Sequence, residues 1–447
     1  MRNGPTKMSL GAAGRNIPAL NRLVYLLTIL ALTTTHAAPG SWNDASRLAT
    51  VQSLVEFHSF VIDKTAFIDT GDKVYIDGHF YSDKPPVPSV LGAVVYLPLY
   101  DAGIALHLGR SLPYYFITLL TVKLFWLLGT VAFFFLLKFT GLDSEKRLLA
   151  SCALGIGSLY FSWSTTFNNH ALAAAFLSIG FYFLIKARFE AKTALPLSIA
   201  ALFLSLAGTA DVPTGIFYVL FLLYVWRDAR LRRGLVFYVL PLFVTVVPAL
   251  ACTYSIHHSI LPVQIVGSYF QYPGSPWTQS SALSGIRAND AKSFLTYAVS
   301  ALIGPKGFLL YNPILWIALW GLYRTIRRRD RFYYEAIVVA AGSSVLVLYY
   351  LVFTNDYSGW SYSIRWFVPL LPLLFFFLYP YFQTCDQRRG RQFCALFAVA
   401  VTIALVGAVD PWSHADLSEV PFIANIKELR LACAHACRLL EHSRSLN

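Results

Sequence analysis

Apolar runs long enough to cross a lipid bilayer recur along almost the whole chain. A hydrocarbon core of about 30 Å requires roughly 20 apolar residues as a helix, and only helices and closed barrels satisfy their backbone groups in lipid. Transmembrane strands span about 10 residues with alternating polarity, a pattern that these runs lack. With 56% hydrophobic and 13% charged residues, the chain is predicted to be an all-α, polytopic transmembrane bundle.

The positive charges interrupt the apolar runs instead of gathering on a soluble face. A net charge of +13 would suggest nucleic-acid binding only if a basic patch with aromatic residues covered a soluble surface, so no nucleic-acid partner is expected. Basic residues next to transmembrane helices are typical of the cytoplasmic side. The basic clusters placed there are 2–22, 146–147, 186–192, 227–233, 324–331 and 388–391.

This charge distribution predicts about eleven spans, with the N-terminus inside and the C-terminus outside. The expected spans are 23–39, 113–138, 148–167, 171–186, 194–209, 213–226, 235–254, 307–323, 334–353, 366–382 and 392–409. Residues 87–106 would reverse every later cluster if they crossed, so a juxtamembrane or re-entrant helix on the outer face is expected there. For the first span, a cleaved signal peptide is the alternative, because a basic start and a short apolar run precede small residues.

The chain is accordingly divided into a transmembrane domain, residues 1–409, and a short extracytoplasmic tail, residues 410–447. The domain carries a first outer loop at 40–87 and a long outer loop at 255–306, whereas the inner loops are short and basic. Because outer loops on a rigid scaffold commonly carry function, a site is expected outside, where these loops converge.

Asp44 is the first candidate catalytic residue, since it follows the first span by a few positions and precedes Arg47 by three. A carboxylate near a membrane interface beside apolar side chains tends to have a raised pKa, which suits a general base. The alternative is a helix N-cap, in which the Asp44 side chain accepts hydrogen bonds from backbone N–H groups.

Two cations are candidates for binding a phosphate group. Lys84 is followed by two prolines, which limit the freedom of the chain, and its ammonium group can meet a phosphate as a point charge. Arg365 ends a Tyr- and Trp-rich segment at the edge of an apolar run, where an arginine requires an anionic partner. The alternatives are a lysine that snorkels to the headgroups and a structural pair between Arg365 and Asp356.

Polar residues in two short outer turns complete the candidate site. Asn169 and His170 lie in one turn and Asp211 in the other, where spans are expected to reach the outer mouth. Ordinary turn formation is the alternative. The histidines and cysteines provide no persuasive ligand set, so neither a metal nor a cofactor is predicted.

Together these features resemble the membrane-embedded glycosyltransferases of the GT-C type, in particular the bacterial branch related to protein O-mannosyltransferases and the aminoarabinose transferase of lipid A. The first outer loop of that family opens with an Asp-Glu-x-x-Arg-like sequence and ends in Lys-Pro-Pro, similar to residues 44–47 and 84–86. Ala45 replaces the second acidic residue, for which Asp72 or Asp77 is a candidate substitute. A late Gly-Trp-x-x-x-x-Arg motif of related sequences is similar to residues 359–365.

The resemblance implies an integral membrane enzyme, in a bacterial inner membrane, that takes a sugar from a polyprenyl-phosphate donor on the outer side. The sugar passes to a hydroxyl of a lipid, glycan or protein acceptor. On this hypothesis Asp44 is the general base, and Lys84 and Arg365 neutralise the leaving phosphate. The substrate pocket would contain Arg47, Asn169, His170 and Asp211.

A transporter or flippase of a lipid-linked sugar is the alternative function. It would require charged residues along a pathway at the middle of the membrane, paired broken helices and an inside-facing site. Apart from Lys123, the predicted spans carry little such charge. A third interpretation, a non-catalytic partner in a cell-envelope complex, would require none of the outer polar residues.

Overall fold

The structure is a computed structural model that describes residues 17–277, 291–354, 357–415 and 419–431. Seven helices in these ranges are long and apolar enough to cross a membrane. They are Ile17–Thr34, Leu112–Thr140, Asn169–Phe189, Leu231–His257, Tyr333–Phe353, Arg365–Gln383 and Gln387–Val409, and shorter apolar helices cover Ala194–Ala210, Val212–Arg227 and Phe294–Ile303. The predicted helical membrane bundle is confirmed, while the number of spans stays a prediction.

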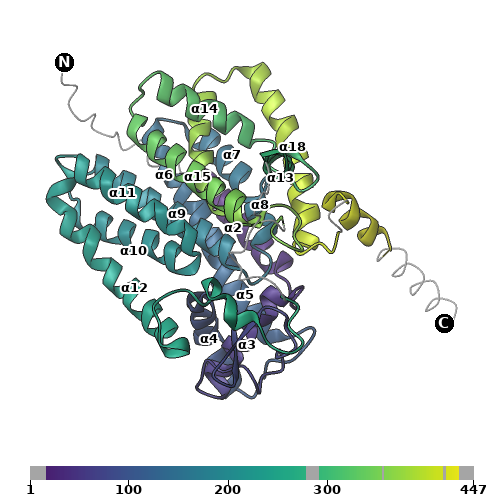
Figure 1. Cartoon of the computed structure of the whole chain (residues 1–447). Helices are drawn as coiled ribbons and strands as arrows, with labels where there is room; N and C mark the ends of the chain where they lie inside the picture. The colour runs from purple at the N-terminus through teal and green to yellow at the C-terminus, as the bar shows by residue number, and fades with distance from the viewer. Residues whose placement is uncertain (1–16, 278–290, 355–356, 416–418, 432–447) are drawn as a thin grey trace.

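The regular elements follow the chain in the order shown in Figure 1. The first part contains α2 (Ile17–Thr34), α3 (Trp42–Glu56), β1 (Lys73–Ile76), β2 (His79–Ser82), α4 (Pro86–Asp101), α5 (Leu112–Thr118), α6 (Leu124–Leu136), α7 (Ser144–Gly155), α8 (Leu159–Trp163) and α9 (Asn169–Phe189). The second part contains α10 (Ala194–Ala210), α11 (Gly215–Arg227), α12 (Leu235–His257), α13 (Ala291–Ile303), α14 (Leu315–Arg327), α15 (Tyr333–Phe353), α16 (Leu371–Phe375), α17 (Tyr379–Gln383) and α18 (Gln387–Val409).

Helix α9 occupies the centre of the bundle, with α6 and α10 packed against it and α12 packed on the far side of α10 (Figure 1). Small residues allow this close approach, as they commonly do between membrane helices. A Cβ atom on Gly129 would lie 3.0 Å from the Cα of Ala175 in α9. A Cβ on Gly180 would lie 2.7 Å from Leu204 of α10. Larger residues at these two glycines would therefore push the central helices apart.

The span expected at 148–167 is not one continuous helix, and the structure corrects it. Helix α7 ends at Gly155, and α8 begins after Ser158, whose hydroxyl accepts a 3.2 Å hydrogen bond from the Tyr160 N–H. A serine N-cap with glycine on its N-terminal side favours a new helix start over a continued one. The break leads the chain into the turn at residues 164–168, which contributes to the candidate site.

The two ends of α9 differ in chemistry. Its 21 residues correspond to about 30 Å of helix, beginning at Asn169 and ending at Phe189. At the Phe189 end Arg188 forms an ion pair with the buried Glu335, and Arg230 donates a 3.1 Å hydrogen bond to the Arg188 carbonyl. Basic residues predicted to be cytoplasmic therefore gather at the end of the bundle opposite Asn169.

Beyond the Asn169 end lies the first loop, in which α3 and α4 pack together below the bundle in Figure 1. Between them β1 and β2 form an antiparallel hairpin whose turn residues Asp77 and Gly78 have φ values of 50° and 91°. Two positive φ angles match the turn type that suits the twist of a two-residue hairpin. Helix α4 is the helix expected at 87–106, and at 16 residues it is shorter than the roughly 20 needed to span.

The long loop after α12 covers this hairpin. Val263 and Phe270 are buried against Val74 and Ile76 of β1, and the indole N–H of Trp277 donates a 2.8 Å hydrogen bond to the Gly71 carbonyl. The two loops predicted to lie outside the membrane are thus packed on each other. Residues 278–290 of the long loop lie outside the described residues.

Candidate functional site

Asp44 lies in the first turn of α3 and is completely buried. The predicted N-cap alternative is wrong for α3, because Ser41 is the cap and its hydroxyl accepts a 3.1 Å hydrogen bond from the Asn43 N–H. The Asp44 carboxylate instead receives donors from four separate segments on its Oδ2 atom. They are the Gly40 N–H at 3.0 Å, the Tyr114 hydroxyl at 3.2 Å, the Thr166 hydroxyl at 2.9 Å and the Trp412 indole N–H at 2.8 Å.

The second oxygen of Asp44, Oδ1, is buried and has no hydrogen-bond partner among the described residues. Burial raises the pKa of Asp44 to about 6, and the hydrogen bonds from Gly40, Thr166 and Trp412 together with the charge of Arg47 oppose the increase. A carboxylate with a pKa near the working pH and an open lone pair is suited to take a proton. The geometry is therefore compatible with the role predicted for Asp44.

Arg47 lies one turn further along α3 and is also buried. Its guanidinium donates hydrogen bonds to the Asn43 carbonyl at 3.0 Å and to Oδ1 of Asn169 at 2.5 Å. Burial lowers the pKa of Arg47 to about 10, while Asp44 and Asp83 oppose the decrease. Arg47 is thus cationic at neutral pH, and it joins the first loop to the start of α9.

Lys84 lies between two carboxylates. Its ammonium is 2.8 Å from Asp72 and 2.9 Å from Asp83, and the three side chains are only 15%, 13% and 8% exposed. Burial raises the pKa of Asp83, and Lys84 opposes the increase. Of the two candidate substitutes for the missing acid, Asp72 belongs to this cluster, whereas Asp77 lies in the hairpin turn.

Arg365 lies against the aromatic residues beside Asp44. Its guanidinium carbon is 5.1 Å from the ring centre of Trp412 and 6.0 Å from that of Trp163, and it donates hydrogen bonds to the carbonyls of Ser358 and Trp360. The positive charge of Arg365 contributes to the lowered pKa of Arg47. The two guanidinium groups are therefore close enough to repel each other. The predicted alternative partner, Asp356, lies outside the described residues.

His170 and Asp211 are brought together from different helices. His170 lies in the first turn of α9, which Asn168 caps by accepting a 3.0 Å hydrogen bond from the Ala171 N–H. Asp211 directly follows α10, and its carboxylate is 2.7 Å from Nδ1 of His170. Both side chains are buried, and the pair adjoins Asn169 and hence Arg47. The predicted convergence of the short turns with the first loop is therefore observed.

Three residues that hold Asp44 escaped prediction. Tyr114 begins a predicted span, Thr166 follows an apolar run, and Trp412 belongs to the segment predicted as a tail. A tryptophan shortly after a span usually indicates an interfacial anchor, so sequence position offered no sign that Trp412 enters the site. Among the described residues no group of three or more His, Cys, Asp or Glu side chains could hold a metal.

Comparisons with known proteins show where this fold has been seen. No family model and no curated protein matches the chain. The structure of ArnT from Cupriavidus metallidurans bound to undecaprenyl phosphate matches with a TM-score of 0.55 and 15% identity, over 91% of this chain and 67% of that one. The structure of the same protein in the apo state matches with a TM-score of 0.54 and 15% identity, over 92% of this chain and 67% of that one.

AglB of Archaeoglobus fulgidus in complex with an inhibitory peptide and a dolichol-phosphate gives a TM-score of 0.49 and 12% identity, over 87% of this chain and 55% of that one. ArnT, an aminoarabinose transferase, and AglB, an oligosaccharyltransferase, are both GT-C glycosyltransferases. The present chain is an integral membrane protein, and it has the GT-C fold that its first-loop motifs predict.

Proposed function

We propose that the protein is an integral membrane glycosyltransferase that moves a sugar from a polyprenyl-phosphate donor to an acceptor hydroxyl on the extracytoplasmic face. The observation that carries the proposal is the setting of Asp44, whose Oδ2 is held by four donors while Oδ1 has no described partner. A related fold bound to undecaprenyl phosphate, in ArnT, supports a lipid-linked donor.

In the proposed reaction Oδ1 of Asp44 takes the proton of the acceptor hydroxyl. The hydroxyl oxygen attacks the anomeric carbon as the bond from that carbon to the phosphate oxygen breaks, and polyprenyl phosphate leaves with the bonding electrons. A single displacement of this kind inverts the anomeric configuration. Because Asp44 is completely buried, the acceptor reaches it only when the covering segments open locally.

The departing phosphate gains negative charge, so fixed cations near it stabilise the transition state. Arg365 is the principal candidate, because it shares Trp412 with Asp44 and acts electrostatically on Arg47. The ammonium of Lys84 has three donors, and its carboxylate partners Asp72 and Asp83 leave one of them for a phosphate. Lys84 therefore serves the donor less directly than Arg365 does.

The remaining predicted residues form the wall of the proposed sugar pocket. Arg47 and Asn169 are joined by a 2.5 Å hydrogen bond, and the hydrogen-bonded pair of His170 with Asp211 follows on the same turn of α9. Charged and amide groups of this kind are the usual partners of sugar hydroxyls, since buried polar groups must be paired. In this proposal they orient the donor sugar against Asp44.

The outward orientation rests on charge distribution. The residues around Asp44 lie at the start of α9, and the basic residues Arg188 and Arg230 lie at its other end. Basic loops are retained on the cytoplasmic side, so Asp44 faces outward, in the inner membrane of a bacterium. The assay below determines whether the acceptor is a lipid, a glycan or a protein.

The test uses the full chain in lipid nanodiscs with a panel of labelled polyprenyl-phosphate sugars and envelope extract as acceptor. We expect transfer or hydrolysis by the wild type and by Asp101→Asn, which removes an exposed carboxylate, but not by Asp44→Asn. Donor binding is measured separately and is expected in all three. Binding without turnover in every protein would contradict the proposal and favour the transporter.

A further inference from the structure

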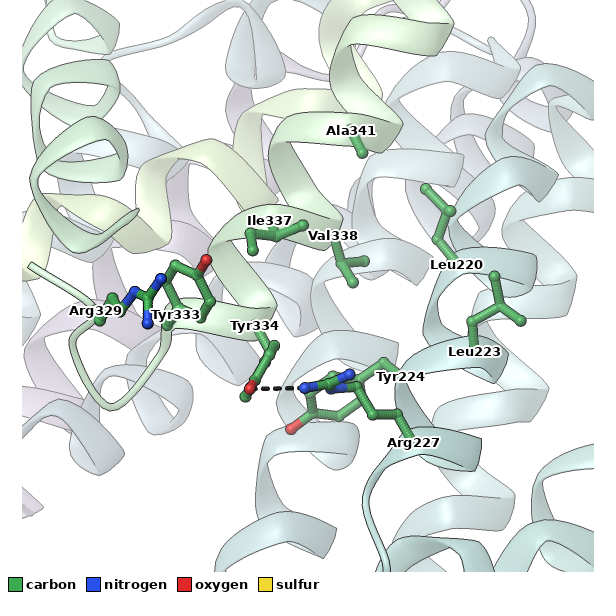
Figure 2. Close-up of a pocket in the computed structure, with 10 residues that line it drawn as sticks. All are labelled: Leu220, Leu223, Tyr224, Arg227, Arg329, Tyr333, Tyr334, Ile337, Val338 and Ala341. Carbon is green, nitrogen blue, oxygen red and sulfur yellow. Dashed lines mark hydrogen bonds between the residues drawn. The ribbon is translucent and has the colours of Figure 1, made fainter. Parts of the chain in front are cut away.

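A groove of about 480 Å³ lies between α11 and α15 and contains none of the residues proposed for catalysis. Figure 2 shows one face of α11 opposite one face of α15, with the side chains of both converging on the groove. Its volume falls within the range of about 300–1,000 Å³ that small-molecule sites occupy. The groove adjoins the ion pair of Arg188 with Glu335, so it lies at the end of the bundle opposite Asp44.

The walls of the groove are apolar over its inner part. Leu220 and Leu223 of α11 face Ile337, Val338 and Ala341 of α15 (Figure 2). Leu223 is 54% and Ile337 39% exposed, so the protein itself does not cover these side chains. An apolar channel between two helices in a membrane protein is open to the acyl chains of lipids.

The mouth of the groove is basic and aromatic. Arg227 donates a 2.8 Å hydrogen bond to the Tyr334 hydroxyl and lies 4.4 Å from the centre of its ring. Arg329 lies 5.8 Å from the ring centre of Tyr333. Figure 2 shows Arg227 at the end of the groove away from Leu220 and Ala341, and Arg329 next to Tyr333 on the side of α15 that faces away from α11. Hydrogen bonding and stacking hold Arg227 in place without neutralising its charge.

Nearby carboxylates are engaged elsewhere. Asp228 accepts the backbone N–H groups of Arg230 and Leu231, at 2.9 Å and 3.0 Å, and Asp330 accepts the Tyr379 hydroxyl at 2.6 Å. No ion pair between described residues includes the guanidinium of either Arg227 or Arg329. The mouth therefore has two guanidinium groups available to an external anion.

The floor of the groove does not repel an anion either. Tyr224 lines the groove and donates a 2.6 Å hydrogen bond to Glu335, which also pairs with Arg188. The carboxylate that Tyr224 contacts, Glu335, is thus balanced by the guanidinium of Arg188. The resulting arrangement is a positive mouth that leads into an apolar channel.

We propose that this groove binds one anionic glycerophospholipid from the surrounding leaflet, with its phosphate at Arg227, the rest of its headgroup toward Arg329 and one acyl chain along Leu220, Leu223 and Ile337. Basic pockets between membrane helices on the cytoplasmic side bind anionic headgroups, and arginine suits phosphate because its donors form a fork. The site is separate from the proposed catalytic site, and it does not depend on the proposed reaction.

The test is native mass spectrometry of the delipidated full chain titrated with phosphatidylglycerol and, separately, with phosphatidylcholine of the same acyl composition. We expect one phosphatidylglycerol to bind about tenfold more tightly than phosphatidylcholine, because both carry the phosphate but only phosphatidylcholine adds a cationic choline, which the two arginines repel. The double substitution Arg227→Gln with Arg329→Gln is expected to remove the preference. The matched pair Arg232→Gln with Arg233→Gln removes the same charge from an exposed turn outside the groove and is expected to retain it.

A further variant, Ala341→Phe, fills the apolar wall without changing charge, and we expect it to weaken binding of both lipids. Thermal unfolding confirms that each variant is folded. Equal binding of the two lipids to the wild type would overturn the proposal, as would equal loss in the two arginine pairs, which would indicate a diffuse charge effect. Displacement of phosphatidylglycerol by glycerol phosphate at equal concentration would exclude a role for the acyl chain, and preferential binding of undecaprenyl phosphate would replace the proposed ligand.

Discussion

The indole Nε1 of Trp412 donates a 2.8 Å hydrogen bond to Oδ2 of Asp44, although 368 positions separate the two residues. The same indole packs edge-on against Trp163, with ring centres 4.9 Å apart, and lies under the guanidinium of Arg365. One side chain from the segment after α18 therefore contacts both Asp44, the proposed base, and Arg365, which is proposed to bind the donor phosphate. In the proposed reaction Trp412 is a positioning residue, and a pH profile can distinguish that role from simple packing.

Trp412→Phe keeps an aromatic ring against Trp163 but removes the N–H donor. The hydrogen bond from Trp412 lowers the pKa of Asp44, so its loss is expected to raise that pKa above about 6. A hydrogen bond to a charged group contributes about 1.5–3 kcal/mol, and one pKa unit is 1.36 kcal/mol. We expect the acidic limb of kcat/KM to move up by about one pH unit. A lower plateau with an unchanged limb would show that the ring acts through packing alone.

The wild-type enzyme is expected to lose activity in acid. Asp44 must be ionised to accept a proton, and burial raises its pKa to about 6, so kcat/KM should fall about tenfold per pH unit below that value. Activity measured from pH 4.5 to pH 8 checks the limb. A profile flat down to pH 5 would exclude Asp44 as the titrating base.

The contribution of Asp44 to the free energy of unfolding should change with pH in the direction opposite to activity, so that it is larger in acid. The pKa of Asp44 is raised from the model-peptide value of 3.8 to about 6 in the folded protein, so the folded state binds the proton more tightly. The stabilisation from this group is complete below its unfolded pKa and is lost as the pH rises through about 6. We expect Asp44→Asn to remove this part of the pH dependence of unfolding, measured against the wild type between pH 4.5 and pH 7.5.

Asp44→Asn is also expected to separate catalysis from folding. Loss of a general base lowers the rate by about 10²–10⁴-fold, whereas an uncharged amide avoids the desolvation that raises the pKa of Asp44. The free energy of unfolding at pH 7.5 should therefore be no lower than that of the wild type. Single-turnover transfer and chemical unfolding measure the two quantities. Reduced stability with retained turnover would assign Asp44 a structural role.

Lys84 and Arg365 are expected to differ when each is removed. Lys84→Ala leaves Asp72 and Asp83 without their shared cation, and breaking such a buried pair costs about 3 kcal/mol or more. Adding Asp72→Asn and Asp83→Asn to Lys84→Ala should restore stability, measured by unfolding.

Arg365→Gln, in contrast, should weaken catalysis by about 10²-fold through lost phosphate stabilisation. Its KM for the donor is expected to rise, while the KM for the acceptor stays unchanged, in steady-state assays with each substrate varied in turn. An unchanged rate and donor KM would remove Arg365 from the donor site.

The residues of the candidate site that sequence could place were found for two reasons. Asp44, Arg47 and Lys84 lie in a polar loop within an apolar chain, where a charged residue is conspicuous. Asn169 and Asp211 follow from alternating spans, because turns that fall on one side of the membrane meet at one end of the bundle. Local spacing and topology were therefore sufficient to place these residues near one another and to predict the helical fold, while their roles stay predictions.

The remaining parts depend on tertiary packing. Thr166 enters the site because the chain turns after the break between α7 and α8. A hydropathy pattern, which is averaged over many residues, does not detect such a short break. Trp412 has the position of an interfacial anchor but packs against Trp163. Lys84 pairs with its neighbour Asp83 and with Asp72 because of the path that the hairpin takes. The spacing of residues in the sequence does not predict that path.

The contact of Trp412 with Asp44 also fixes when the site can be completed. Chains are made from the N-terminus and their segments fold in that order, so α3 and its carboxylate are in place long before α18 has been inserted. Until then Asp44 lacks one of the donors that lower its pKa. A nascent chain that stalls before α18 therefore carries every predicted site residue but lacks the indole that completes the hydrogen bonds to Asp44.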